Sequence, residues 1–346
     1  MTLGRTMRFA VPFVISAVLL LLLAHSVADQ KDELVGALGN ADWRLVVPAI
    51  GLYFIGAYIR GARWGLLLPA YNIPTLTLFR ALVVGFTVNN LLPLRMGEIA
   101  RAYLLARWRG VAYGATIASL VMERVLDGLS LAILLLLALL FVPSAPGYLV
   151  VAGVIAGAGF LAGTVVLGLA SWRASSVTWL ARTLTRPLPP RIQHLALRLA
   201  ESFAHSLALV RGARRLLALL ALSLLAWCAE LGVFYVLLFG FPIRGSYPLA
   251  LLVGASANFA TLLPSSPGYV GTFDNALVKV LSDSAGISPG LALAYAVVVH
   301  ATLFLPVVVL GTLVLWRSHV SFDQVTHAPD SAPTPAGGGG DWQAAA

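Results

Sequence analysis

Two short polar stretches interrupt a very apolar chain and hold most of the residues that could do chemistry. The first, NNLLPLRMGEIAR, runs from Asn89 to Arg101 and contains two asparagines, two arginines and a glutamate. The second, MERVLD, contains Glu123, Arg124 and Asp127, and the i,i+4 spacing places its two carboxylates on one helix face. Such groups can bind an anionic headgroup, couple to protons, or form structural ion pairs between helices.

The composition of the chain decides the setting of these groups. Of 346 residues, 59% are hydrophobic and 11% are charged, and the mean hydropathy is +0.89. A soluble domain carries about 25% charged residues, so the sequence predicts an integral membrane protein. An ionisable residue near the middle of a bilayer costs at least ~2.5 kcal/mol. Each of these charges therefore needs a partner, water or a function.

About six stretches approach the roughly 20 apolar residues that a bilayer-crossing helix needs. They are residues 9–27, 45–59, 116–142, 148–170, 216–240 and 291–316. The second is short and reaches span length only by continuing through Arg60 and Arg63, which are then expected to snorkel to the interface. The first is interpreted as a retained span, because no small-x-small cleavage site follows it.

The distribution of basic residues predicts the orientation. The loop 171–215 holds eight arginines and one acid, whereas the loop 28–44 is acidic. The positive-inside rule then places both termini and the basic loop in the cytoplasm, and no nucleic-acid partner is expected. Residues 191–210 have the periodicity of an amphipathic helix, either on the inner leaflet or packed on the membrane domain. A membrane domain of residues 1–320 is expected, followed by a disordered tail, 321–346.

Counting the crossings leaves two segments that begin and end on the same side, residues 75–110 and 247–283. Each must enter the membrane and turn back. The two segments share VG, a small hydroxyl residue, an asparagine, a Leu-Pro pair and a glycine, in that order. The predicted fold is therefore an all-α membrane protein with two re-entrant helical hairpins arranged as an inverted repeat, a plan that recurs in transporters. The halves are expected at about 45–142 and 214–316.

Prolines and glycines mark the expected breaks in these hairpins: Pro93, Gly97, Pro264, Pro267, Gly268 and Gly271. Lipid cannot satisfy the backbone groups that a break exposes, so such backbone is buried in protein or lines a wet cavity. A helix that restarts after a break points free N–H groups and its positive end inward, and Arg95 lies beside the first restart. This arrangement favours an anion such as phosphate. The alternative is a purely structural interhelical turn.

The buried charges are expected to form one polar network, comprising Arg95, Glu98, Arg101, Glu123, Arg124, Asp127, Glu230 and Asp274. Structural pairing and a role in binding or proton coupling are both open, since intramembrane charges are functional candidates. His300 is expected to be a satisfied interior histidine rather than a proton relay. The sequence has no GxSxG, HExxH, Walker A or paired-cysteine motif, so no enzyme activity, metal or cofactor is expected.

Three motifs in order resemble the flippase-like membrane domain of the lysylphosphatidylglycerol synthase transmembrane-region family. They are N-x-x-x-P-x-R-x-G-E-x-x-R (Asn89–Arg101), E-R-x-x-D (Glu123–Asp127) and P-x-x-P-G-x-x-G (Pro264–Gly271). The likeness covers about residues 45–316. Many relatives carry a glutamate shortly after the last glycine. This chain has Asp274 near that place, and Asp274 is the candidate to stand in for it.

The resemblance implies lipid translocation in the inner membrane. In the multiple peptide resistance factor such a domain precedes an aminoacyl-transferase domain, which is not expected after Trp316, so lysyl transfer is not expected either. Stand-alone relatives are associated with polyprenyl-linked, glyco- or hopanoid-type lipids. The leading hypothesis is a flippase for an anionic lipid whose headgroup binds to Arg95, Arg101, Arg124, Asn89 and Asn258. The carboxylates of Glu98, Glu123, Asp127, Glu230 and Asp274 then position the arginines or couple to protons.

Two alternatives from other classes remain open. The first is a membrane enzyme that acts on a lipid-linked phosphate or sugar, with Glu98, Glu123 or Asp127 as base. The second is a non-catalytic scaffold that docks a lipid-modifying enzyme through residues 191–210.

Overall fold

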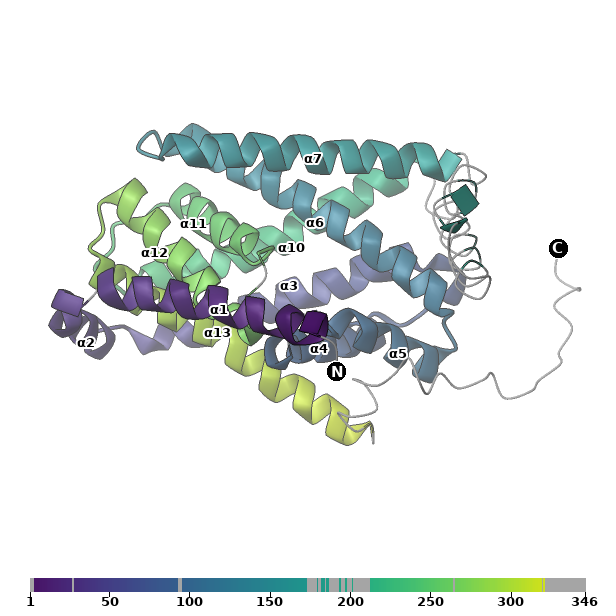
Figure 1. Cartoon of the computed structure of the whole chain (residues 1–346), viewed down its shortest axis with the longest axis horizontal. Helices are drawn as coiled ribbons and strands as arrows, with labels where there is room; N and C mark the ends of the chain where they lie inside the picture. Colours follow the sequence, from purple (N-terminus) through teal and green to yellow (C-terminus); the bar gives the residue numbers. More distant parts are fainter. Residues whose placement is uncertain are drawn as a thin grey trace, which may run out of the picture.

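The computed structural model is built from helices, and none of the residues that it describes lies in a strand. Those residues are 3–26, 28–92, 95–172, 212–263 and 265–318, with isolated positions between 179 and 201 and Val320. Five helices that are both long and apolar form the main bundle, and they run roughly along the longest axis of the molecule (Figure 1). They are α3 (Val46–Leu67), α6 (Tyr113–Phe141), α7 (Gly147–Trp172), α10 (Ala213–Leu238) and α13 (Pro289–Arg317).

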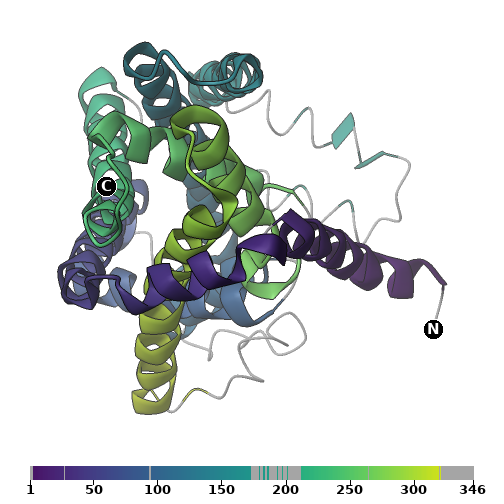
Figure 2. The ribbon, with the colours of Figure 1, turned by 90° about the vertical axis from the view of Figure 1, so that its left-hand side faces the viewer.

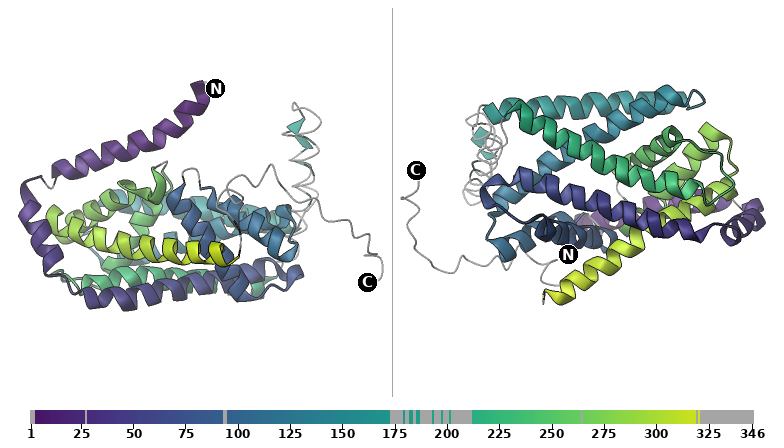
Figure 3. Two further views of the ribbon diagram at one scale, coloured as in Figure 1. Left: turned by 90° about the horizontal axis from the view of Figure 1, so that it is seen from below. Right: turned by 180° about the vertical axis from the view of Figure 1, so that it is seen from behind.

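These five helices are long and apolar enough to cross a membrane. A sixth crossing is added if α1 (Leu3–Ser26) forms one broken span with η1 (Ala28–Gln30) and α2 (Lys31–Gly39). The angle between Val14–His25 and Ala28–Gly39 is 55°. The N-terminal part of α1 leans away from the bundle (Figures 2 and 3). The prediction of an all-α, multi-pass membrane protein with about six spans is confirmed.

Four shorter helices form two hairpins between the long ones. The first hairpin joins α4 (Thr75–Leu91) to α5 (Gly97–Arg109), and the second joins α11 (Tyr247–Ala260) to α12 (Thr272–Ala285) through the single turn η4 (Pro267–Tyr269). At 1.5 Å per residue, α4 and α11 are roughly 26 and 21 Å long, less than the ~30 Å hydrocarbon core of a bilayer. These lengths agree with re-entrant hairpins, which stay a prediction.

The two halves of the chain pack against each other in matching pairs. Helix α3 lies along α10 (Figure 3), α4 packs on α13, and α11 packs on α6. A two-fold relation that exchanges the halves would produce these same pairs. The pairing therefore supports the inverted repeat without establishing it, and the half-repeat boundaries likewise stay predictions.

The expectation that Arg60 and Arg63 snorkel to the interface is wrong. Helix α3 directly follows η2 (Trp43–Leu45) and ends at Leu67, before η3 (Pro69–Tyr71). Both arginines therefore lie inside the helix. Both are buried, and Arg63 has no exposed surface. Carboxylates on α6 and α10 neutralise them there, so they have no need to reach the surface.

Several predictions concern positions outside the described residues. They are Pro93 and Pro264, most of the amphipathic segment 191–210, and the tail 321–346.

Glycine packing closes the first hairpin and brings the polar motif of α5 against α4. A Cβ added to Gly97 would collide with the carbonyl oxygen of Gly85 and with the side chain of Asn89. The first obstacle is backbone, so it cannot swing aside. The glycine of the R-x-G-E motif is therefore required by the close approach of two helices.

Gly97→Ala should lower the stability of the protein by about 1–3 kcal/mol, the usual cost of overpacking a tight contact. Thermal unfolding of the purified protein in detergent measures the effect. Gly51→Ala is the matched control, because this α3 glycine has no atom within 4 Å of an added Cβ; it should be neutral or slightly stabilising. Equal melting temperatures for the two variants would contradict this account of the hairpin.

Candidate functional site

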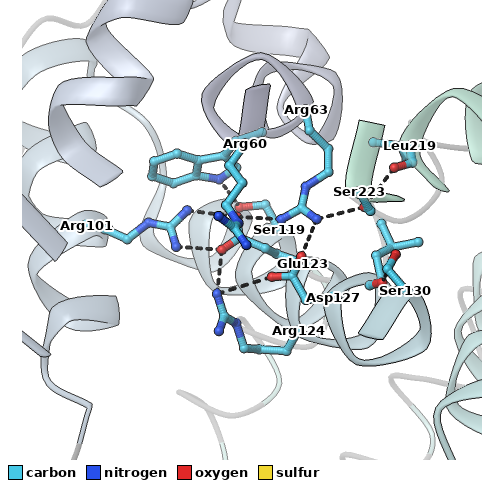
Figure 4. Close-up of polar contacts among 12 residues, drawn as sticks. Arg60, Arg63, Arg101, Ser119, Glu123, Arg124, Asp127, Ser130, Leu219 and Ser223 are labelled. Carbon is cyan, nitrogen blue, oxygen red and sulfur yellow. Dashed lines mark hydrogen bonds and ion pairs between the residues drawn. The ribbon is translucent and has the colours of Figure 1, made fainter. Parts of the chain in front are cut away.

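A buried ion network surrounds Glu123 on α6 (Figure 4). The Arg101 guanidinium on α5 binds the Glu123 carboxylate through two hydrogen bonds of 2.7 and 2.9 Å. Arg124 donates to the same carboxylate at 2.7 Å, and a nitrogen of Arg63 on α3 lies 3.5 Å from it. Glu123 has no exposed surface, so three helices deliver cations to one carboxylate that water does not reach.

Asp127, one helical turn further along α6, extends the network to α10. Its carboxylate accepts hydrogen bonds from Arg63 and, at 3.1 Å, from the indole N–H of Trp227. Arg63 also donates to the hydroxyl of Ser223 on α10, at 2.7 Å. The side chains therefore tie α3, α6 and α10 together. Removing one partner of a buried pair would leave an uncompensated charge, which is strongly destabilising.

Two tryptophan rings pack against the planar guanidinium groups of Arg60 and Arg101. The guanidinium of Arg60 lies 4.4 Å from the ring centroid of Trp227 and pairs with Glu230 at 2.6 Å. The guanidinium of Arg101 lies 4.0 Å from the ring of Trp64. A cation over an aromatic face gains electrostatic stabilisation that grows when water is absent. Each of these guanidinium groups is therefore held by an aromatic ring on one face and by a carboxylate at its nitrogen atoms.

The breaks in the two hairpins touch through Arg95. This residue follows the first break and has a backbone φ of +53°, which residues other than glycine rarely adopt. Its guanidinium donates to the carbonyl of Thr261, at the end of α11, at 2.9 Å. No ion pair joins Arg95 to a carboxylate within the described part of the chain. Arg95 is thus a cation at the meeting point of both halves.

The backbone at the restarts is less available to an anion than expected. The Gly97 N–H, which opens α5, donates to the Asn89 side chain at 2.7 Å. The Gly271 N–H, which precedes α12, donates to the Asp274 carboxylate at 3.0 Å. The expectation of free N–H groups is wrong at these two positions, because nearby side chains occupy them. Side-chain donors, above all Arg95, are the better candidates.

The second break is shaped by glycines and by a histidine. Gly268 and Gly271 have φ values of +71° and +89°, which favour glycine. Pro267 opens η4, Ser266 makes no side-chain cap there, and the longer helix restarts only at Thr272. His300 on α13 contacts Asp274 at 2.7 Å and the Gly268 carbonyl at 2.9 Å, so its ring is satisfied as expected.

A cavity of about 320 Å³ joins the ion network to both breaks. Six charged side chains line it: Arg60, Arg95, Glu98, Arg124, Asp127 and Glu230. Asn89, Asn258 and His300 also line it. The lining includes five phenylalanines as well: Phe86, Phe160, Phe259, Phe273 and Phe304. A charged headgroup and an apolar chain would each find matching side chains.

The structure divides the predicted site residues into two groups. Those that reach the cavity are Arg95, Arg124, Asn89, Asn258, Glu98, Asp127, Glu230 and Gly268. The described ones that are not among its lining residues are Arg101, Glu123, Asp274, Gly97, Pro267 and Gly271, and the first three of these are buried. Arg124 is the network arginine with most access, since 41% of its side chain is exposed. It lies 3.8 Å from Glu98 and 3.5 Å from Asp127.

Sequence reasoning missed Arg60 and Arg63 as site residues, together with Trp64 and Trp227. A signal was present, because two arginines inside an apolar helix are expensive wherever they do not reach an interface. The described residues contain no cluster of three His, Cys, Asp or Glu side chains that could hold a metal ion.

Comparison with known proteins adds a family and a set of relatives. The family described as Lysylphosphatidylglycerol synthase TM region matches residues 9–311. The chain is 29% identical to the glycosyltransferase AglD of Haloferax volcanii, over 83% of this chain and 51% of that protein. Two UPF0104 membrane proteins of Methanothermobacter thermautotrophicus are each 24% identical to this chain. The first alignment covers 74% of this chain and 78% of that protein, and the second covers 77% of this chain and 83% of that protein. The chain therefore spans about half the length of the first relative.

Glu123→Gln should destabilise the protein by about 3–5 kcal/mol, because it leaves buried arginines without their shared carboxylate. Glu98→Gln is the matched control. It removes a carboxylate that also faces Arg124, but its half-buried ion pair at 3.8 Å should contribute less than about 1 kcal/mol. Thermal unfolding of both variants in detergent measures the difference. A Glu98→Gln variant that melts as early as Glu123→Gln would show that the network is not organised around Glu123.

Proposed function

Because this chain belongs to the lysylphosphatidylglycerol synthase transmembrane-region family, we propose that it translocates an anionic lipid or lipid-linked headgroup across the membrane. One observation carries the proposal. Arg95 reaches from one broken hairpin to the other, lines the cavity, and has no carboxylate partner in the described residues. A cation held this way at the centre of a membrane protein is suited to a negatively charged group that enters and leaves.

Arg95 and Arg124 are the proposed headgroup ligands. Both line the cavity, and Arg124 has exposed surface to offer. Asn89 and Asn258, one from each hairpin, also line the cavity and supply amide groups for hydroxyl or phosphate oxygens. The phenylalanines of the lining accommodate the start of an acyl or prenyl chain.

Arg101 takes a different role from the one first expected. It is buried, and both terminal nitrogens bind Glu123. We assign it a positioning role: together with Arg63 it neutralises Glu123, so Arg124 can turn toward a headgroup without leaving a bare carboxylate behind. The cations of the site are thus divided between permanent structure and exchangeable binding.

Translocation requires that the cavity open to each side in turn. Inverted repeats achieve this when one half rocks against the other around a fixed site. The Arg95–Thr261 hydrogen bond joins the two breaks, and a bound headgroup would compete for the same guanidinium. We place the protein in the inner membrane with both termini in the cytoplasm, in line with its basic loop.

A second candidate is an enzyme that acts on a lipid-linked sugar. The glycosyltransferase name of the Haloferax volcanii relative favours it, although the alignment covers only half of that protein. Of the three carboxylates considered as a base, Glu123 and Asp127 are held by arginines. Glu98 is half-buried, lines the cavity and has one ion pair, at 3.8 Å. Glu98 is therefore the best base for this alternative.

Arg95→Gln should slow headgroup translocation by about 10- to 150-fold, which corresponds to the loss of a ~1.5–3 kcal/mol hydrogen bond to a charged group. The lipid is first identified by native mass spectrometry of the purified protein, then reconstituted in proteoliposomes with a headgroup label whose sidedness is scored by a membrane-impermeant quencher. Arg80→Gln is the matched control, because Arg80 is an exposed arginine on α4 that does not line the cavity.

Equal rates for Arg95→Gln, Arg80→Gln and the unaltered protein would contradict the proposed role of Arg95. Mass spectrometry of the lipid before and after incubation separates the two candidate functions. An unchanged mass with moved headgroups supports transport. A covalently altered lipid that disappears in Glu98→Gln supports the enzyme instead.

A further inference from the structure

The ring of His300 lies between two groups that accept hydrogen bonds. Its Nδ1 atom is 2.7 Å from Oδ1 of Asp274, and its Nε2 atom is 2.9 Å from the carbonyl oxygen of Gly268. The other carboxylate oxygen of Asp274 accepts from the Gly271 N–H. A carbonyl can only accept, so Nε2 must carry a hydrogen for its contact to be a bond.

This geometry determines how many protons the pair holds. With a hydrogen on Nε2, the short contact between Nδ1 and Oδ1 needs one more hydrogen between those two atoms. It can sit on the ring, giving imidazolium and carboxylate, or on the oxygen, giving neutral imidazole and carboxylic acid. Both forms contain one proton more than a carboxylate beside a neutral imidazole. The described geometry therefore belongs to a proton-loaded pair with no net charge, whichever atom carries the proton.

Loss of that proton would break one of the two bonds. The single remaining ring hydrogen would stay on Nδ1 and bond to the carboxylate, because hydrogen bonds to charged groups are roughly twice as strong as neutral ones. A bare Nε2 would then face the Gly268 carbonyl at 2.9 Å, lone pair against lone pair. No other partner holds that carbonyl among the described residues, and an unpaired carbonyl in an apolar setting is costly.

The segment that would respond is already strained. Gly268 is followed by Tyr269, whose φ of +61° is rare for a residue with a side chain. Such strain persists only where surrounding contacts enforce it, and the His300 contact is one of them. Gly268, Tyr269 and Phe273 all line the cavity, and η4 packs on α4 of the opposite half.

Other charged groups do not substitute for the pair. Phe273 and Phe304 flank the ring of His300 edge-on, with centroids 5.1 and 6.1 Å away. The charged residues that share the cavity are Arg60, Arg95, Glu98, Arg124, Asp127 and Glu230, and Tyr53 and Tyr269 add two phenols. Within the described chain none of these carboxylates pairs with His300, and none of these arginines pairs with Asp274.

We propose that Asp274 and His300 form a proton-binding site whose loading holds the turn Pro267–Tyr269 against α13 and whose unloading releases it. The proton comes from water in the cavity and returns there, and the pair changes its charge by one. Where the proposed translocation holds, this site would couple the movement of the cavity wall to a proton gradient. Proton binding itself needs no lipid, so it can be tested separately.

The test is a pH titration by ¹⁵N NMR of imidazole-labelled protein in nanodiscs of phosphatidylcholine, with His300→Gln to assign the His300 signals. In the unaltered protein, Nε2 of His300 should pass from hydrogen-bearing to bare as the pH rises. Asp274→Asn is the matched variant, because its amide can donate to Nδ1 while its oxygen accepts from Gly271. It keeps every bond of the loaded pair without the titrating proton, so Nε2 should stay hydrogen-bearing throughout.

Amide hydrogen exchange of the peptide containing Gly268 and Tyr269 reports the turn. At alkaline pH the unaltered protein should exchange about fivefold faster than Asp274→Asn, the factor for one hydrogen bond of ~1 kcal/mol. At acidic pH the two should agree. An Nε2 that is bare at every pH, an Nε2 that never titrates, or equal exchange at alkaline pH would each overturn the proposal.

These readouts separate the proton site from the proposed function. A normal titration in a protein that moves no headgroup contradicts translocation alone. Active translocation with a flat titration overturns the proton site alone.

Discussion

The structure depends on one carboxylate that is buried among arginines. Glu123 has no contact with water, and arginines from α3, α5 and α6 converge on it. In a medium of low dielectric, neither the acid nor the cations could remain there alone. The helices that carry them must therefore stay together. The same constraint fixes the part of α6 that carries Arg124, the arginine of this cluster that lines the cavity, so the scaffold and the site cannot be altered independently.

A second constraint links the two halves across the cavity. The contact from Arg95 to the Thr261 carbonyl, together with the packing of α4 on α13 and of α11 on α6, makes each break part of the environment of the other. Glycine at positions 97 and 268 permits the close approach on each side. A headgroup that binds Arg95 would disturb both breaks at once, which is what a transporter with coupled halves requires.

Sequence reasoning predicted the elements well and the contacts poorly. Apolar runs and their charges gave the membrane class, the long helices and the short ones around Asn89 and Asn258, because these follow from local composition. It misjudged Arg60 and Arg63, since their carboxylate partners lie on α6 and α10, far along the chain. It also expected free N–H groups at the helix restarts, because it could not show that Asn89 and Asp274 bond to them. Whether a charge is buried, like Arg101, or faces a cavity, like Arg95, depends on tertiary packing.

The two polar clusters differ in the chemistry that their residues allow. Arginine does not lose its proton in proteins, so the network around Glu123 has a fixed charge and suits a permanent tie between helices. The pair of Asp274 and His300 contains a histidine, the residue type whose side chain ordinarily changes its charge between pH 5 and 8. It contacts the strained turn at the second break, which is packed on the opposite half. The proposed translocation requires that the protein both holds together and moves, and each cluster suits one of these tasks. The positions of these two, one among the long helices and one at a break, match those two tasks.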